Sequence, residues 1–172
     1  RKRLACARPV AIPTEKLNAW LELARFSGSA SNKQPLKYIL SNQAETNEKI
    51  FECLAWAGYL KEWDGPVEGE RPTAYVIILR DRNLTNNAGI DPGIVAQSIM
   101  LGAVEEGFGG CMLGAINRPK LDANLGIVDN FETLLVIALG KPAETVILED
   151  AEPGGDIKYY RDEDDNHHVP KR

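Results

Sequence analysis

The chain has 172 residues, of which 44% are hydrophobic and 26% charged, and it carries a formal net charge of −5. These values are typical of an ordinary soluble globular protein, and the length suits one domain over residues 1–172. No apolar run approaches the ~20 residues that a membrane-spanning helix needs, and a net negative chain is not attracted to phosphate backbones. The composition therefore argues against a membrane or a nucleic acid as a partner.

Cysteine usage indicates a reducing, cytoplasmic compartment. Cys6, Cys53 and Cys111 are an odd number, too sparse for a disulfide framework, and none belongs to a Cys-x-x-Cys pair that would suggest a metal site. The sequence begins at Arg1, with neither Met nor the charged and apolar regions of a secretory signal. We therefore expect no secretory signal, no metal and a trimmed or partial chain.

The first predicted elements are a basic arm and a helix. Pro9 and Pro13 force an extended path on the arm, which either contacts a phosphate or is a frayed terminus. Its basic residues are Arg1, Lys2, Arg3 and Arg8. A helix is predicted from Thr14, its expected N-cap, to about Phe26. Its buried face repeats at helical spacing and consists of Leu17, Trp20, Leu21 and Ala24.

Small and polar residues fill the stretch from Ser27 to Leu36. The small residues at its start allow a backbone to approach a ligand closely, and Pro35 then sends the chain on in an extended conformation. Hydroxyl and amide groups that donate or accept hydrogen bonds are carried by Ser29, Ser31, Asn32 and Gln34. Composition alone leaves two interpretations open, a binding loop and a solvated linker.

The middle of the chain predicts two strands, a helix and an aromatic loop. The strands are Tyr38–Leu40 and Thr73–Leu79, the second a continuous apolar run suited to a buried central strand. Between them Thr46 can cap a helix, whose buried face would consist of Ile50, Phe51, Leu54 and Ala55. Residues 56–66 are aromatic and poorly periodic, so side chains such as Trp63 either cover an aromatic ligand or pack against their own domain.

A long apolar helix and a glycine-rich turn follow. Asp91-Pro92 is expected to cap and begin the helix, which runs to Glu106 and, being apolar almost all round, should lie in the interior or at a subunit interface. Residues 107–114 then turn into a short strand whose glycines let the backbone lie flat against a planar ring. Cys111 has no evident base, because His occurs only in the polar C-terminal stretch. No side chain is therefore expected to act as a nucleophile.

The last predicted elements are a short helix, a strand and a tail. The helix opens at Arg118-Pro119 and ends at Gly126, and the strand spans Thr133–Leu139. From about Ala151 acidic residues alternate with Gly and Asn and no hydrophobic period survives, which predicts an extended, surface-crossing tail without a core of its own. The order of elements supports an α/β or α+β fold and no more.

Three blocks of the chain resemble the FMN-dependent nitroreductase family, in the order in which that family carries them. The segment from Ala24 to Leu36, ARFSGSASNKQPL, is similar to the family's flavin loop. Residues 91–116 resemble a second block through the strings AQSI and EGFGGCMLG, and residues 135–142, LVIALGKP, resemble a third. Together the blocks cover most of the chain.

The resemblance implies an α+β nitroreductase-like fold, with a central, mainly antiparallel β-sheet flanked by helices, in an interlocked homodimer. It implies that loops from both subunits bind each FMN. The residues implied to do so are Ser29, Ala30, Ser31, Asn32 and Gln34 along the ring and ribityl chain, Leu113, Gly114 and Ala115 beside the reactive edge, and Arg1, Lys171 and Arg172 at the phosphate. The N-terminal segment departs from the family, with Lys2 in place of Ser and no Arg-Phe pair after it. Asp91 could face the flavin from its helix start, although a plain N-cap is the expected role.

The activity implied by the resemblance needs no catalytic side chain. The flavin would accept a hydride at N5 from NADH or NADPH and pass it to a small electron acceptor such as a nitroaromatic or a quinone. Two other classes stay open. One is a flavin-binding protein without significant turnover, and the other is a cofactor-free interaction domain, which the altered N-terminal segment keeps in view.

Overall fold

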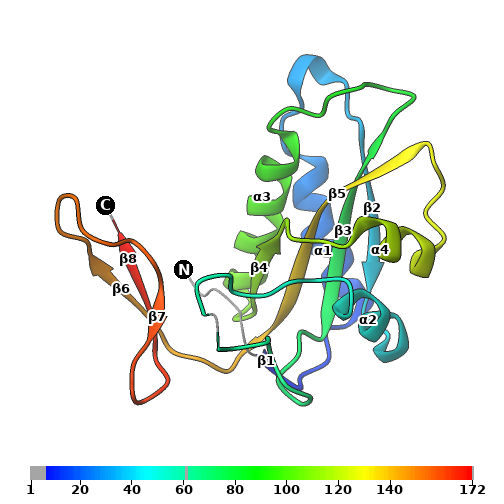
Figure 1. The fold of residues 1–172 in the computed structure, drawn as a ribbon. Helices are drawn as coiled ribbons and strands as arrows, with labels where there is room; N and C mark the ends of the chain where they lie inside the picture. The colour runs from blue at the N-terminus through cyan, green and yellow to red at the C-terminus, as the bar shows by residue number, and fades with distance from the viewer. Residues whose placement is uncertain (1–6, 61, 172) are drawn as a thin grey trace.

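The computed structural model describes residues 7–60 and 62–171 (Figure 1). Its body is a five-stranded sheet in the order β1-β5-β3-β2, with β4 also paired to β5. The four pairings are antiparallel. The strands are β1 (Ala7–Arg8), β2 (Leu36–Ser41), β3 (Ala74–Asp81), β4 (Gly109–Leu113) and β5 (Phe131–Pro142). This architecture confirms the predicted α+β fold with a mainly antiparallel central sheet.

The central strand β3 explains why the body has two cores. Successive side chains of a strand point to opposite faces of its sheet, so the apolar run of β3 serves both faces. One core contains Ala74, Val76 and Ile78, and the other contains Tyr75, Ile77 and Leu79. All six side chains are at most 3% exposed. The prediction of a buried central strand here is confirmed.

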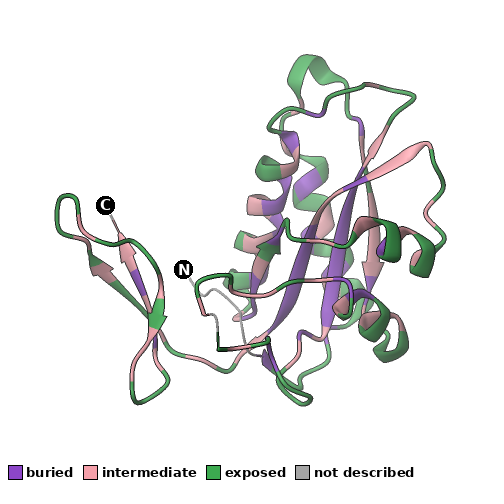
Figure 2. Cartoon of the chain, viewed as in Figure 1, coloured by how far each residue is buried: buried purple, intermediate pink, exposed green. Residues whose placement is uncertain are grey.

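Two pairs of helices cover the two faces of the sheet (Figures 1 and 2). The first pair, α1 (Thr14–Arg25) and α3 (Asp91–Glu105), encloses the core that contains Trp20 and Ile99. The second pair, α2 (Ala44–Phe51) and α4 (Arg118–Leu125), encloses the core that contains Ile50 and Leu121. Among the described residues, none of these helices is both long enough and apolar enough to cross a membrane.

Each predicted helix is present, but α2 ends at Phe51, so the prediction that Leu54 and Ala55 belong to its buried face is wrong, and Ala55 is exposed. Three helix starts also differ from the prediction. The N-cap of α1 is Pro13 and that of α2 is Gln43, so the predictions of Thr14 and Thr46 as N-caps are wrong. The hydroxyl of Thr14 instead accepts a hydrogen bond from Asn42 at 3.0 Å. The N-cap of α3 is Ile90, so Asp91 does not cap its own helix either. By contrast, α4 ends as predicted at Gly126, whose φ of 65° is left-handed.

The C-terminal stretch forms a second sheet that projects from the body (Figure 1). Its three strands, β6 (Val146–Asp150), β7 (Tyr160–Arg161) and β8 (His167–Lys171), lie in the order β6-β8-β7, with β6 and β8 parallel. The prediction of an extended tail without a core is wrong in this respect. Val169 and His167 are only 5% and 4% exposed, and non-local pairing, which hydrophobic periodicity does not reveal, holds the strands together.

Candidate functional site

The loop between α1 and β2 has an unusual backbone. It contains one turn of 3-10 helix, η1 (Ala30–Asn32), and three of its residues other than glycine have left-handed φ values. These are Ser31 and Asn32, both at 53°, and Gln34 at 48°. Each such residue costs about 1–3 kcal/mol and persists only where the surrounding structure fixes it, which is typical of ligand-binding segments. The loop therefore has a fixed conformation, which favours the binding-loop interpretation over the solvated linker.

The carboxylate of Asp91 holds this loop. It accepts a hydrogen bond of 2.6 Å from the Ser29 hydroxyl, and the Ala30 amide lies 3.2 and 3.3 Å from its two oxygens. The Ser29 oxygen in turn accepts a 2.9 Å hydrogen bond from the amide of Gln34. Asp91 is only 2% exposed, so these contacts form away from water, where charge-assisted hydrogen bonds are strongest.

A cleft of about 300 Å³ opens beside the loop. Its walls come from the end of α1, from the loop, from the start of β2 and from the first turn of α3. Tyr38 lines it from β2, and burial, followed by the negative charge of Asp91, raises the pKa of Tyr38 to about 12. The Tyr38 phenol therefore stays protonated at neutral pH. Charged side chains at the cleft include Glu22, Arg25 and Lys37.

The second group of predicted site residues lies at the end of β4. Leu113 is buried in the core beneath α2 and α4, whereas Gly114 and Ala115 are exposed. The Ala115 carbonyl accepts a 3.0 Å hydrogen bond from the amide of Ala55, which fastens this segment to the chain that follows α2. A Cβ placed on Gly114 would meet no atom within 4 Å. The exposed backbone here is thus open to a flat ligand.

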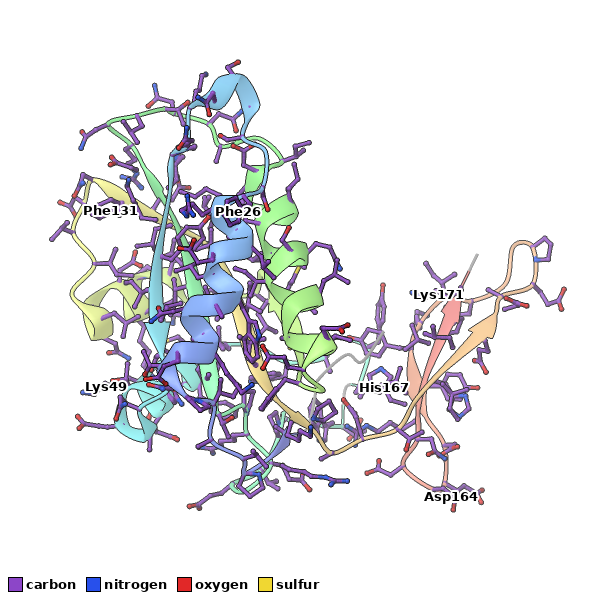
Figure 3. All side chains as sticks on the ribbon, turned by 180° about the vertical axis from the view of Figure 1, so that it is seen from behind. Phe26, Lys49, Phe131, Asp164, His167 and Lys171 are labelled. Atoms are coloured by element: carbon purple, nitrogen blue, oxygen red, sulfur yellow. The ribbon has the colours of Figure 1, made fainter. Side chains whose placement is uncertain are left out.

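The third group belongs to the C-terminal sheet. Lys171 is half-buried on β8, where it is the register partner of Asp150 on β6. Figure 3 shows Lys171 well separated from Phe26, which lies beside the binding loop at the end of α1. The two other residues predicted to hold a phosphate, Arg1 and Arg172, lie outside the described residues.

A single chain therefore keeps these groups at separate places in the fold. The cleft beside Ser29 is not lined by residues 113–115 or by Lys171. Within the loop, Gln34 donates hydrogen bonds to Ser29 and Asn32, through its amide and its side chain respectively. Trp63, considered as a cover for an aromatic ligand, packs against the C-terminal sheet instead, with the Arg161 guanidinium 4.9 Å from its ring centre.

Sequence reasoning missed the role of Asp91. The Asp-Pro pair reads as a helix start, and the expectation of a plain N-cap follows from that local pattern. The actual partners of Asp91 lie 61 and 62 positions earlier in the chain. The available signal was an acidic residue at the start of a helix that is otherwise apolar, because a buried carboxylate requires hydrogen-bond donors.

Comparison with known proteins assigns the chain to a family. The family model described as "Nitroreductase family" matches residues 7–141. The chain therefore belongs to the nitroreductase family.

Solved structures share the fold at low sequence identity. A nitroreductase family protein from Streptococcus pneumoniae is 16% identical, with a TM-score of 0.71 and 90% of this chain and 92% of that chain covered. An FMN-dependent nitroreductase from Clostridium difficile is 17% identical, with a TM-score of 0.68 and 84% of each chain covered. A nitroreductase family protein from Clostridium novyi is 24% identical, with a TM-score of 0.67 and 83% of this chain and 82% of that chain covered.

Proposed function

We propose that this chain is a cytoplasmic, FMN-dependent oxidoreductase that passes a hydride from NADH or NADPH to a nitroaromatic, a quinone or a similar acceptor. We propose further that residues 1–172 form a single nitroreductase-like domain that works as a homodimer. Family membership over residues 7–141 supports the class of activity. The observation that carries the proposal is the left-handed loop at Ser31, Asn32 and Gln34, fixed beside a cleft.

The donor set of the loop fits a flavin. Ser31, Asn32 and Gln34 are exposed and carry hydroxyl and amide groups, which match the carbonyl oxygens and ring nitrogens of an isoalloxazine and the hydroxyls of a ribityl chain. When bound, FMN supplies the redox chemistry, hydride acceptance and donation at N5. The residues of this chain supply position and charge.

The other two groups would complete the site. In this proposal the segment from Leu113 to Ala115 lies beside the reactive edge of the ring, and the exposed backbone of Gly114 and Ala115 can offer N–H groups to it. Lys171, with Arg1 and Arg172, would hold the phosphate, because a dianionic phosphate is bound best by charge-assisted hydrogen bonds. Ser29 and Ala30 would approach the ring through the fixed loop.

A homodimer would reconcile the separation of these groups, because loops of one subunit could meet the β4 end of the other. An apolar stripe along the outer side of α3 supports this arrangement. The stripe consists of Ile90, Ile94, Leu101 and Val104, which are 76%, 39%, 61% and 37% exposed. Exposed apolar surface of this kind is typical of an interaction surface.

The activity is tested with purified protein after incubation with FMN. We expect a flavin absorption spectrum that survives gel filtration, anaerobic bleaching by NADH or NADPH, and reoxidation by a nitroaromatic or a quinone. Bound flavin that neither nicotinamide reduces would indicate a flavin-binding protein without turnover. Protein that stays colourless with added FMN would indicate a cofactor-free interaction domain and overturn the proposal.

The dimer is tested by placing a charge on the stripe. Leu101→Lys should yield a monomer in light scattering and lose FMN, because one subunit alone keeps the three groups apart. Val67→Lys is the matched control, since Val67 is 63% exposed and lies outside α3. An unchanged dimer in Leu101→Lys, or a monomeric wild type that binds FMN, would contradict the proposed assembly.

A further inference from the structure

We propose that Asp91 is a positioning residue, whose buried carboxylate holds Ser29 and Ala30 and thereby keeps the loop in the shape that receives the cofactor. This inference rests on the proposed function for its ligand, but its structural basis stands on the contacts of the loop. No part of it needs Asp91 to touch the flavin.

The Asp91 carboxylate accepts hydrogen bonds from the loop and not from its own helix, α3. The start of α3 has no side-chain cap, and its N-cap residue is Ile90. Asp91 reaches instead to the first residue of the η1 turn, where its oxygens accept from the Ala30 amide at 3.2 and 3.3 Å. It thus caps η1 from a distant part of the chain, and α3 acts as the scaffold on which the loop is fixed.

The hydrogen bonds of Asp91 continue through Ser29 to Gln34 on the far side of the loop, and we call this set of contacts the clamp. The Ser29 hydroxyl donates to Asp91 at 2.6 Å, and its oxygen accepts from the Gln34 amide at 2.9 Å. This chain of hydrogen bonds closes the loop across five positions. The three left-handed residues, Ser31, Asn32 and Gln34, lie within or at the end of that closed segment. Their conformation needs such fixing, because L-residues do not adopt it freely.

The two ends of the loop are fixed by contacts that do not involve Asp91. The hydroxyls of Ser27 and Ser98 lie 2.8 Å apart, which ties the start of the loop to α3. At the other end Pro35 is buried, and its carbonyl accepts from the Asp81 amide at 2.9 Å. Loss of the Asp91 carboxylate should therefore release the middle of the loop and leave its ends and the body in place.

The clamp also restricts what Ser29 can do for a ligand. A hydroxyl has one hydrogen to donate and two lone pairs that accept. In Ser29 the hydrogen goes to Asp91 and one lone pair goes to Gln34, so one acceptor site remains. Ser29 can therefore accept from the cofactor but cannot donate to it, and donors from this loop must come from other groups, such as Ser31 and Asn32.

The test compares Asp91 with Asp122, which offers a matched control. Asp122 also lies on a helix, α4, and accepts a 2.6 Å hydrogen bond from a hydroxyl, that of Thr133, but it is remote from the loop in sequence and fold. Variants of both residues to Ala and to Asn are made in the full chain. FMN affinity is measured by fluorescence titration, and amide hydrogen exchange is measured on the protein without added flavin.

We expect Asp91→Ala to raise the FMN dissociation constant at least tenfold and to speed exchange at residues 30–34 at least tenfold, with the β3 amides unchanged. Asp91→Asn keeps an acceptor oxygen and should recover part of both losses. Both Asp122 variants should change FMN affinity less than twofold. Equal effects of Asp91 and Asp122 variants, or unchanged exchange at residues 30–34 in Asp91→Asn and Asp91→Ala, would overturn the proposal. If Asp91→Ala does not fold, the two Asn variants decide by the same criteria.

A double-mutant cycle tests the route through Ser29. In a Ser29→Ala background the effect of Asp91→Ala on the FMN dissociation constant should fall from at least tenfold to less than threefold, because the partner that transmits it is gone. An undiminished effect would overturn this route. If the wild type binds no FMN, the proposed function fails, and the exchange data still decide whether Asp91 holds the loop.

Discussion

The body sheet and the C-terminal sheet are held together by different forces. Both faces of the body sheet are covered by helices, and its central strands are almost fully buried, whereas the C-terminal sheet is mostly half-buried or exposed (Figure 2). The body contains two apolar cores. The C-terminal sheet relies on ion pairs and ring contacts. A small sheet can therefore be specified by charged groups, and its stability then depends on their protonation.

One part of this charge network surrounds His168 on β8. Its two ring nitrogens lie 3.2 Å from Glu149 on β6 and 3.0 Å from Asp162, which follows β7. The ring stacks on Tyr160 of β7, with centroids 4.7 Å apart and an interplanar angle of 10°. His168 thus connects the three strands of this sheet by its side chain as well as by its backbone.

A second part fastens the C-terminal sheet to the body. Glu144 lies 3.2 Å from Arg161 and 3.4 Å from His167, with its side chain 5% exposed. The rings of Tyr59 and Tyr159 lie 5.0 Å apart, and Tyr159 also contacts His167. The aromatic loop at residues 56–66 is therefore the surface of the body against which the C-terminal sheet packs.

The largest contrast between the two regions should come from removing one apolar side chain from each. Ile137→Ala in β5 should lower the free energy of unfolding by about 2–5 kcal/mol, because Ile137 is fully buried. Ile147→Ala in β6 is the counterpart, and at 36% exposure it should change that free energy by about 0.5 kcal/mol or less. Urea titration measures both. Similar losses in the two variants would mean that apolar burial stabilises the C-terminal sheet as strongly as it stabilises the body.

The next largest effect should come from the ion pair between Glu144 and Arg161. Glu144→Gln removes a buried charge that faces Arg161 and His167, and a hydrogen bond to a charged group contributes about 1.5–3 kcal/mol. The loss should be local, with faster hydrogen exchange in β7 and β8 and unchanged exchange in β3. Glu152→Gln is the control, since Glu152 is exposed. Equal exchange in β3 and β8 after Glu144→Gln would show that the two regions unfold as one unit.

A pH series should separate the regions without a mutation. Hydrogen bonds to Asp162 and then to Glu149 raise the pKa of His168, so its contribution to stability is complete below about pH 6.5 and is lost as the pH rises through its higher folded value. Asn166, followed by His168, lowers the pKa of Asp162 to about 2, so its contribution is present above about pH 4 and is lost as the pH falls towards 2. The C-terminal sheet should therefore be most stable between about pH 4 and 6.5.

The measurement is amide exchange in β8, corrected for the intrinsic pH dependence of exchange, with β3 as the internal reference. His168→Gln should remove the loss of protection above neutral pH. The idea fails if the wild type and His168→Gln lose protection in β8 at the same pH.

The same contrast explains how far the sequence could predict this fold. Elements with a strong local signal, such as the apolar run of β3 and the Arg118-Pro119 start of α4, were predicted correctly because their hydrogen bonds and burial follow from nearby residues. The C-terminal sheet was missed, since β6 pairs in parallel with β8 across the register Val146 to His167, and the three apolar residues that begin β6 do not reveal a partner so distant in the chain. In the candidate site the composition of the loop from Ser29 to Gln34 left a binding loop and a solvated linker open, and the resemblance favoured the binding loop with FMN as the expected ligand. Its clamp could not, because Asp91 is distant in the chain.

The smallest effect expected is that of a single hydroxyl between the two regions. The Tyr59 amide donates to the Tyr159 hydroxyl oxygen at 3.3 Å, a direct hydrogen bond between the aromatic loop and the C-terminal sheet. Tyr159→Phe keeps the ring contacts and removes this acceptor, so it should cost about 0.5–1.5 kcal/mol, detected as faster exchange of the Tyr59 amide. Tyr160→Phe is the matched control, because the Tyr160 hydroxyl lies 3.5 Å from Glu149, at the limit of a hydrogen bond, and does not reach the body. A larger effect from Tyr160→Phe than from Tyr159→Phe on the Tyr59 amide would mean that order within the C-terminal sheet, rather than this contact, decides how the two regions pack.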